Sequence, residues 1–202
     1  MRKKRPTQYH HGDLRQALIE TAAKVAAREG VEAIVLTSLA KKTGVSGTAP
    51  FKHFESREAL LVAVAEEGVR RLVERTDAAT KGIDDPLLAQ QRGAMAYVRF
   101  AVEEPGYFRV LVRAETLRAS PMVAQLNAGA RQAMEGLFGA LKSSESKRVA
   151  QRSAAHLTAQ ATIYGLARML VDGLLGEVDG ATAERLAHEV TEVLGRALRP
   201  DS

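Results

Sequence analysis

The apolar positions of this chain recur with the period of an α-helix over most of its length. Between residues 13 and 29, Leu14, Leu18, Ala22 and Val25 lie three or four positions apart and so share one helix face. No long stretch alternates apolar and polar residues with the period of two that a half-buried strand needs. Helix-forming residues are plentiful, and β-branched and aromatic residues are sparse. The pattern therefore predicts an all-α fold.

Turn and capping residues divide this pattern into about nine helices. Gly30 and Gly44 are expected to end the first two, because glycine adopts the left-handed conformation at a helix end without strain. Hydroxyl side chains can accept hydrogen bonds from the free backbone N–H groups at a helix start. Thr37, Ser46 and Ser56 are therefore expected to cap the second, third and fourth helices. The helix that follows Ser56 is expected to run to about residue 80.

Proline after a capping residue marks the later helix starts. Asp85-Pro86 and Ser120-Pro121 have this form, and Pro105 in EEPG ends one helix and begins another. The stretch KSSESK is typical of a loop. Two long helices are expected after it, rich in small residues that let helices approach closely within one chain or between two. Their expected ranges are 147–176 and 181–198.

The positive charge of the chain is concentrated at its N-terminal end. Residues 1–57 hold 11 Lys and Arg against 5 Asp and Glu, a net charge of +6. Residues 58–202 hold the remaining 18 Lys and Arg and the remaining 19 Asp and Glu, a net charge of −1. A basic module on a nearly neutral body predicts a polyanionic partner, although a solvated basic tail explains Arg2, Lys3, Lys4 and Arg5 equally well.

Composition also narrows the compartment and the chemistry. The chain has no cysteine, which excludes disulfides and thiolate metal sites and fits a reducing, cytoplasmic location. No apolar run reaches the roughly 18 residues that a membrane helix needs, so no membrane partner is expected. We expect no cofactor and no metal site.

The stretch GVSGTAPFKHFESR, residues 44–57, carries the most specific chemistry. With the short helix before it, it forms a helix-turn-helix pattern at about 35–54, whose second helix enters the major groove of DNA. Gly47 and Ala49 are small enough for close approach, and Thr48 offers a hydroxyl and a methyl group to a base edge. The remaining residues expected at DNA, mostly at phosphates, are Thr37, Ser38, Ser46, Phe51, Lys52, His53 and Arg57.

Three residues of this stretch have further interpretations. Phe51 belongs either to the core or to the groove-facing surface, and His53 taken alone is more typical of an ordinary surface histidine. Pro50 would be the fourth residue of a helix capped by Ser46, where at most one intrahelical bond is lost.

The same residues resemble the tetracycline-repressor family of transcriptional regulators, the TetR/AcrR group, over about residues 12–66. The motifs that carry the resemblance are Leu39-Ala40, Gly44-Val45-Ser46, Phe51-Lys52-His53-Phe54 and Ser56-Arg57-Glu58-Ala59-Leu60. The opening YHHGDLR and the segment AYVRFAVEEPGYFRVLV resemble one branch, with a WHG-like C-terminal domain. Many members have tyrosine in place of Phe51, so Lys52 or Arg57 would replace the phosphate contact of its hydroxyl.

The resemblance implies a three-helix DNA-binding head at residues 1–57 and a ligand-binding and dimerisation body at 58–202. It also implies a homodimer formed through the last two helices, a pseudo-palindromic double-stranded DNA operator, and a repressor released by a small-molecule effector. Apolar residues of the body are candidates for the effector pocket, although each is more often ordinary core. These candidates are Tyr97, Phe100, Phe108, Met122, Phe138, His156 and Tyr164.

Other interpretations of the body and of the whole chain stay open at this point. Arg109 and Arg113 are four positions apart and face either a carboxylate ligand or water. A helical enzyme has little support, because no nucleophile–base pair, metal cluster or phosphate loop is recognisable, and His10-His11 is poorly spaced for a metal. A non-specific architectural protein is compatible with the charge, but it would not need small groove-facing residues.

Overall fold

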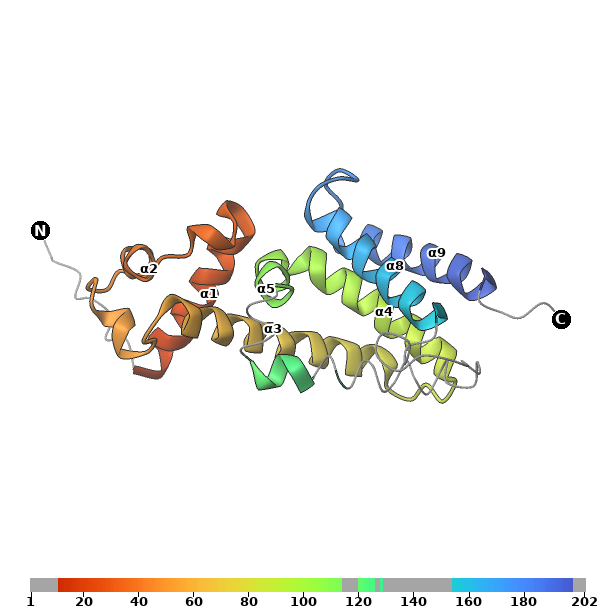
Figure 1. Cartoon of the computed structure of the whole chain (residues 1–202), viewed down its shortest axis with the longest axis horizontal. Coiled ribbons are helices and arrows are strands. Elements are labelled where there is room, and N and C mark those ends of the chain that lie inside the picture. The colour runs from red at the N-terminus through yellow and green to blue at the C-terminus, as the bar shows by residue number, and fades with distance from the viewer. Residues whose placement is uncertain (1–10, 114–119, 126–127, 129–153, 198–202) are drawn as a thin grey trace, which may run out of the picture.

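One long helix, α3 (Arg57–Thr80), joins the two ends of the molecule (Figure 1). The computed structural model describes residues 11–113, 120–125, 128 and 154–197, and every regular element in these ranges is a helix. The head contains α1 (His11–Glu29), η1 (Val31–Ala33), α2 (Leu36–Thr43) and η2 (Ala49–Lys52), where η denotes a 3-10 helix. The body contains α3 (Arg57–Thr80), α4 (Pro86–Glu103), α5 (Pro105–Leu111), α8 (Ala154–Val171) and α9 (Gly180–Ala197). The predicted all-α fold is confirmed.

Several predicted caps are present in the structure. The Ser56 hydroxyl accepts a hydrogen bond from the Ala59 N–H at 3.1 Å and begins α3, which ends at Thr80 as expected. The Asp85 carboxylate accepts bonds from two N–H groups in the first turn of α4. Gly44 ends α2 with a φ of 74°. These signals lie within a few residues of the groups that they satisfy, which is why they could be predicted.

Two predicted caps are wrong. Val35 is the N-cap of α2, so Thr37 lies inside the helix. Ser46 caps no α-helix: a turn follows it, and Thr48 is the N-cap of the 3-10 helix η2. Pro50 explains the second difference, because it has no N–H to donate to a preceding carbonyl, and the short i to i+3 bonds of a turn and 3-10 helix replace the α-helical ladder.

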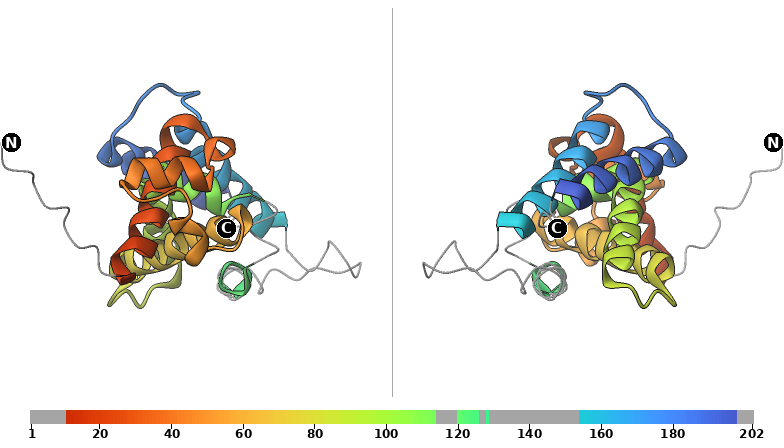
Figure 2. Two further views of the ribbon diagram at one scale, coloured as in Figure 1. Left: turned by 90° about the vertical axis from the view of Figure 1, so that its left-hand side faces the viewer. Right: turned by 90° about the vertical axis from the view of Figure 1, so that its right-hand side faces the viewer.

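The C-terminal part follows the prediction with one shift. α8 ends at Val171, five residues before the expected end, because Gly173 adopts a φ of 74° and the N–H of Leu174 closes the helix on the Met169 carbonyl at 2.9 Å. Residues 121–125 are helical after Ser120, as predicted, but the rest of that helix and the loop KSSESK lie outside the described residues. Viewed from the body end, α8 and α9 lie side by side across α4 (Figure 2).

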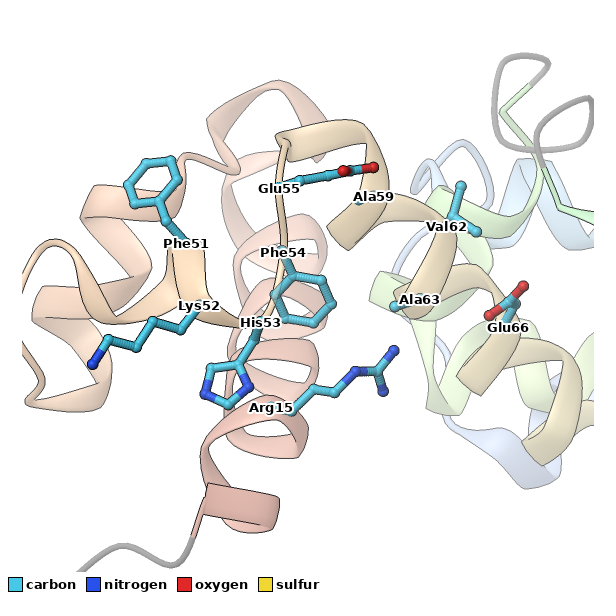
Figure 3. Close-up of a pocket in the computed structure, with 10 residues that line it drawn as sticks. All are labelled: Arg15, Phe51, Lys52, His53, Phe54, Glu55, Ala59, Val62, Ala63 and Glu66. Carbon is cyan, nitrogen blue, oxygen red and sulfur yellow. The ribbon is translucent and has the colours of Figure 1, made fainter.

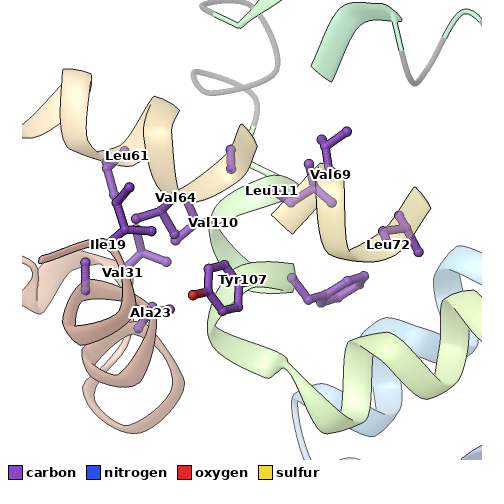
Figure 4. Packing of buried hydrophobic residues seen from close by; sticks show 14 of the residues in the cluster. Ile19, Ala23, Val31, Leu61, Val64, Val69, Leu72, Tyr107, Val110 and Leu111 are labelled. Carbon is purple, nitrogen blue, oxygen red and sulfur yellow. The ribbon is translucent and has the colours of Figure 1, made fainter. Parts of the chain in front are cut away.

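The short helix α5 lies between α1 and α3 and joins the packing of the head to that of the body (Figure 4). Phe108 and Val110 of α5 are fully buried, and they belong to the same apolar cluster as Leu18 of α1 and Val64 of α3. Gly106 allows the closest approach, because a Cβ atom there would lie 1.9 Å from the carbonyl oxygen of Ala23.

Within the ranges given above, no helix is both long and apolar enough to cross a membrane. The same residues contain no group of three His, Cys, Asp or Glu side chains placed to hold a metal ion.

The contact at Gly106 predicts a large effect of one methyl group. Gly106→Ala should lower the free energy of unfolding in urea by about 1–3 kcal/mol or more, because its Cβ would collide with the backbone of α1. Gly93→Ala is the control: Gly93 lies within α4, and the nearest heavy atom to its added Cβ is 3.8 Å away. Alanine there should be neutral or stabilising by about 0.5–1 kcal/mol. Equal effects of the two substitutions would contradict the close packing of α5 on α1.

Candidate nucleic-acid interface

The segment between α2 and α3, residues 45–56, is the candidate interface, and we call it the reading segment. It leaves α2 through the left-handed Gly44, and the Ala49 N–H donates to the Ser46 carbonyl at 3.0 Å. Pro50 is fully buried and the Phe54 side chain is 3% exposed. These two inward residues anchor the segment to the head core in place of a regular α-helix.

Most side chains between and before these anchors face solvent, whereas Val45 and Ala49 are partly buried against the core. Phe51 is 51% exposed, which decides its interpretation in favour of the surface. The Ser46 and Thr48 hydroxyls lie 3.4 Å apart, within hydrogen-bond distance. The structure thus places seven of the predicted DNA-contacting residues on one exposed stretch of chain. Five are exposed, namely Ser46, Gly47, Thr48, Phe51 and Lys52, and two are half-buried, namely Ala49 and His53.

The first turn of α2 offers a second set of polar groups. Thr37 is exposed and Ser38 is half-buried. The N-cap Val35 provides no side-chain hydrogen bond to the N–H groups of this turn. Free N–H groups at a helix start favour an anion, so this turn suits a phosphate.

A hollow of about 550 Å³ opens between the reading segment, α1 and the start of α3 (Figure 3). Lys52 and His53 line it, together with Arg15 of α1. The Arg15 guanidinium carbon lies 5.2 Å from the centroid of the Phe54 ring, a cation–π arrangement. Sequence reasoning did not find Arg15, because nothing near it in the sequence marks its contact with Phe54. It adds a cation to the edge of the interface.

The cations of the head differ in how far their charges are compensated. Lys42 forms an ion pair with Glu29 of α1 at 2.8 Å. Lys52 forms no ion pair with any residue that the structure describes, and its side chain is exposed. Lys52 therefore has its charge available for a phosphate, whereas that of Lys42 is partly used within the head.

Arg57 lies at the first residue of α3, but its guanidinium is directed towards the turn between α1 and α2. Nε donates to the Ile34 carbonyl at 2.9 Å. Nη2 donates to the Val31 carbonyl at 2.9 Å and to the Glu32 carboxylate at 3.2 Å. The sequence predicts phosphate contacts for both Arg57 and Lys52. In the structure, Arg57 is bonded within the head, whereas Lys52 is exposed.

The Glu32 carboxylate is shared by two arginines. Arg113, which follows α5, donates to Oε1, and Arg57 donates to Oε2. The Arg113 hydrogen bond and charge, followed by those of Arg57, lower the pKa of Glu32 below its ordinary value of 4.5. The head turn η1 is therefore tied both to the start of α3 and to the end of α5.

Three of the predicted effector-pocket residues belong to one apolar region of the body. Phe100 and Phe108 are fully buried, and the Tyr97 ring meets Phe108 edge-on with centroids 5.9 Å apart. Burial, and secondarily the neighbouring Tyr164, raise the pKa of the Tyr97 phenol. Tyr164 itself is 42% exposed. The structure thus places Phe100 and Phe108 in the apolar core, Tyr97 against it and Tyr164 at the surface.

The remaining predicted pocket residues are Met122, Phe138 and His156. Met122 is 44% exposed. Phe138 and the side chain of His156 lie outside the described residues. Arg109 is half-buried, and its guanidinium donates to the carbonyls of Ala26, Ala27 and Val171 at 2.7–3.1 Å.

Two family models match the chain in the order of its two parts. The model for bacterial regulatory proteins of the tetR family matches residues 18–64, which include α2, the reading segment and the start of α3. The model for the tetracyclin repressor-like C-terminal domain matches residues 91–194, just over half of the chain. This chain belongs to the tetR family. The family expected from the sequence is thereby confirmed.

Relatives of this tetR-family chain agree with the match. The uncharacterized HTH-type transcriptional regulator YobS of Bacillus subtilis is 31% identical over 98 residues, 48% of this chain and 50% of that protein. The chain thus aligns with about half the length of that curated relative.

Solved structures share the fold over most of the chain. A protein of unknown function from a Rhodococcus species is 25% identical, with a TM-score of 0.69 over 96% of this chain and all of that one. The tetR-family regulator PfmR of Thermus thermophilus is 22% identical, with a TM-score of 0.64 over 91% of this chain and 99% of that one. A ketosteroid transcriptional regulator of Mycobacterium tuberculosis is 17% identical, with a TM-score of 0.68 over 93% and 96%.

The shared carboxylate of this tetR-family head predicts a measurable titration. The pKa of Glu32, followed by NMR of its carboxyl carbon, should lie below 4.5 and rise towards that value in Arg113→Ala. Because the folded-state pKa is lowered, its stabilising contribution is present above the unfolded-state pKa and is lost as the pH falls through the folded-state pKa. Arg92→Ala, an exposed site on α4, is the control and should leave the Glu32 titration unchanged. An unshifted Glu32 in the wild-type chain would contradict the shared contact.

Proposed function

We propose that this tetR-family chain is a transcriptional regulator that binds a pseudo-palindromic DNA operator as a homodimer. In this proposal it represses transcription from the operator and is released when a small-molecule effector enters the body. The reading segment carries the proposal, because it exposes small and polar groups while Pro50 and Phe54 anchor it to the core. Such a regulator acts in the cytoplasm.

The exposed groups divide by the part of DNA that they suit. Gly47, Thr48 and Ala49 are small and suit base edges in the major groove. Lys52 and His53 suit phosphates, as do the N–H groups at the start of α2. The hydroxyls of Thr37, Ser38 and Ser46 are further candidates for phosphate contacts.

Two alternatives are less well supported. A surface that only neutralised phosphates would not need Gly47 and Ala49 beside Thr48, so a non-specific architectural protein explains less of the reading segment. The family match is to regulatory proteins, which argues against an enzyme.

The proposal predicts how DNA binding depends on sequence and salt. Selection from a random duplex library should enrich a pseudo-palindrome with half-sites about 34 Å apart. Titrations of that duplex should show an affinity that falls steeply with salt, and Lys52→Gln should lower the slope by about 0.9 for each lost phosphate contact. Lys81→Gln, exposed at the far end of α3, should leave the slope unchanged. Binding that is indifferent to both sequence and salt would reject the proposal.

The outer surface of α8 supports a homodimer interface. Leu157 and Tyr164 are 38% and 42% exposed, and their separation of seven positions places both on one helix face with the exposed Ala161. On α9, Val193 is 61% exposed. Apolar side chains beside a small residue suit close packing against a second copy of these helices.

Dimerisation can be tested with one charge at this surface. Leu157→Asp should shift the chain from dimer to monomer in sedimentation equilibrium, because the carboxylate would be buried without a partner in the proposed interface. Leu174→Asp is the control: Leu174 is 72% exposed but lies in the turn after α8. A wild-type monomer, or a Leu157→Asp dimer as stable as the wild type, would contradict the proposed interface.

A further inference from the structure

Arg57 stands where the sequence predicts a phosphate contact, yet its guanidinium donates to two backbone carbonyls and a carboxylate of the head. We propose that Arg57 is a positioning residue, which holds the reading segment in its DNA-reading place without contacting a phosphate. The proposal rests on the proposed function and assigns one residue a different role within it.

The Arg57 side chain closes a loop of the head. Its Nε bond to the Ile34 carbonyl spans 23 residues, and the chain between them contains α2 and the reading segment. Ile34 is fully buried, and its carbonyl precedes α2, where no helical ladder supplies a donor. Nη2 binds the Val31 carbonyl in the same turn. A guanidinium fork can hold both carbonyls at once, and an ammonium group cannot reproduce that geometry.

The reading segment is held firmly at the end that Arg57 occupies. Phe54 is buried three residues earlier, and Ser56 caps the first turn of α3 through the Ala59 N–H. Arg57 then fixes this turn to η1. At the other end, Gly44 turns the chain out of α2. Loss of the Arg57 bonds would remove the hydrogen bonds that tie this end to η1 and leave the local Ser56 cap, the Arg15–Phe54 contact and apolar packing.

The charge of Arg57 is compensated by neighbouring carboxylates. The Glu32 carboxylate lies 3.2 Å from Nη2, and that of Glu58 lies 3.9 Å from Nη1. Both carboxylates are largely exposed, at 79% and 75% of their side-chain area. Arg113 also pairs with Glu32, so two positive and two negative charges balance, and the group has no net positive charge to attract a phosphate. Lys52 has no such carboxylate among the described residues.

DNA binding by the full-length chain separates the two roles. The operator selected by the wild type and a random duplex of equal length are titrated at several salt concentrations with Arg57→Gln, Arg57→Lys and Lys52→Gln. Arg57→Gln should weaken operator binding about tenfold or more and leave both random-duplex affinity and the salt slope unchanged. Arg57→Lys should not restore operator affinity, because the fork is lost while the charge remains. Lys52→Gln should weaken both duplexes and lower the slope by about 0.9 for each lost contact.

The opposite pattern would overturn the proposal. If Arg57→Gln weakens both duplexes equally and lowers the salt slope, and Arg57→Lys restores both, Arg57 is a phosphate contact. Affinities are compared per folded chain, so that a loss of fold does not imitate a loss of operator discrimination.

Hydrogen exchange without DNA gives a readout that survives failure of the proposed function. In Arg57→Gln, amides in residues 36–54 should exchange faster than in the wild type, while those of α9 stay protected as evidence of an intact body. Lys52→Gln should match the wild type throughout. Wild-type exchange at 36–54 in Arg57→Gln would refute the positioning role. A wild type that selects no DNA sequence would refute the proposed function, and exchange would still decide what Arg57 does.

Discussion

The close approach of α5 to α1 is the contact on which the arrangement of head and body depends. Gly106 meets the Ala23 backbone where a side chain would not fit. One turn later, Arg109 donates to the carbonyls of Ala26 and Ala27, which lie in the last turn of α1 and have no intrahelical partner. The same guanidinium binds the last carbonyl of α8, that of Val171. One cation therefore closes two helix ends, where helix dipoles favour positive charge.

On its other side, α5 is held by α3. Gly68 of α3 faces the Tyr107 side chain, to which an added Cβ would come within 3.3 Å. The Arg71 guanidinium lies 4.4 Å from the Tyr107 ring centroid and donates to Glu104 at 3.3 Å. The Tyr107 hydroxyl is buried without a hydrogen-bond partner among the described residues, and burial raises its pKa to about 12, so it stays protonated at neutral pH. α5 thus has little freedom to move relative to either long helix.

Contacts between residues close in the sequence could be predicted, and contacts between distant residues could not. Ser56 and Asp85 bind N–H groups two or three residues away, so their caps were visible in the sequence. Arg57 and Arg109 bind backbone carbonyls 23 and 83 residues away, and a carbonyl leaves no side-chain signature. The difference at Pro50 is of another kind: the sequence predicts an α-helix that loses at most one bond, whereas the chain adopts a turn and a 3-10 helix around a buried proline. The sequence therefore predicted which polar and small residues the reading segment offers, but not the backbone conformation that presents them.

The bonds at η1 explain how so small a head keeps a defined orientation. Glu32 accepts from Arg57 at the start of α3 and from Arg113 beyond the end of α5, so one turn is tied to both helices. Exposed ion pairs of this kind add little to stability, but their direction restricts rotation of the turn. The reading segment follows α2, which begins directly after that turn. Its placement is therefore set by the relative positions of α3 and α5 as well as by the packing of the head.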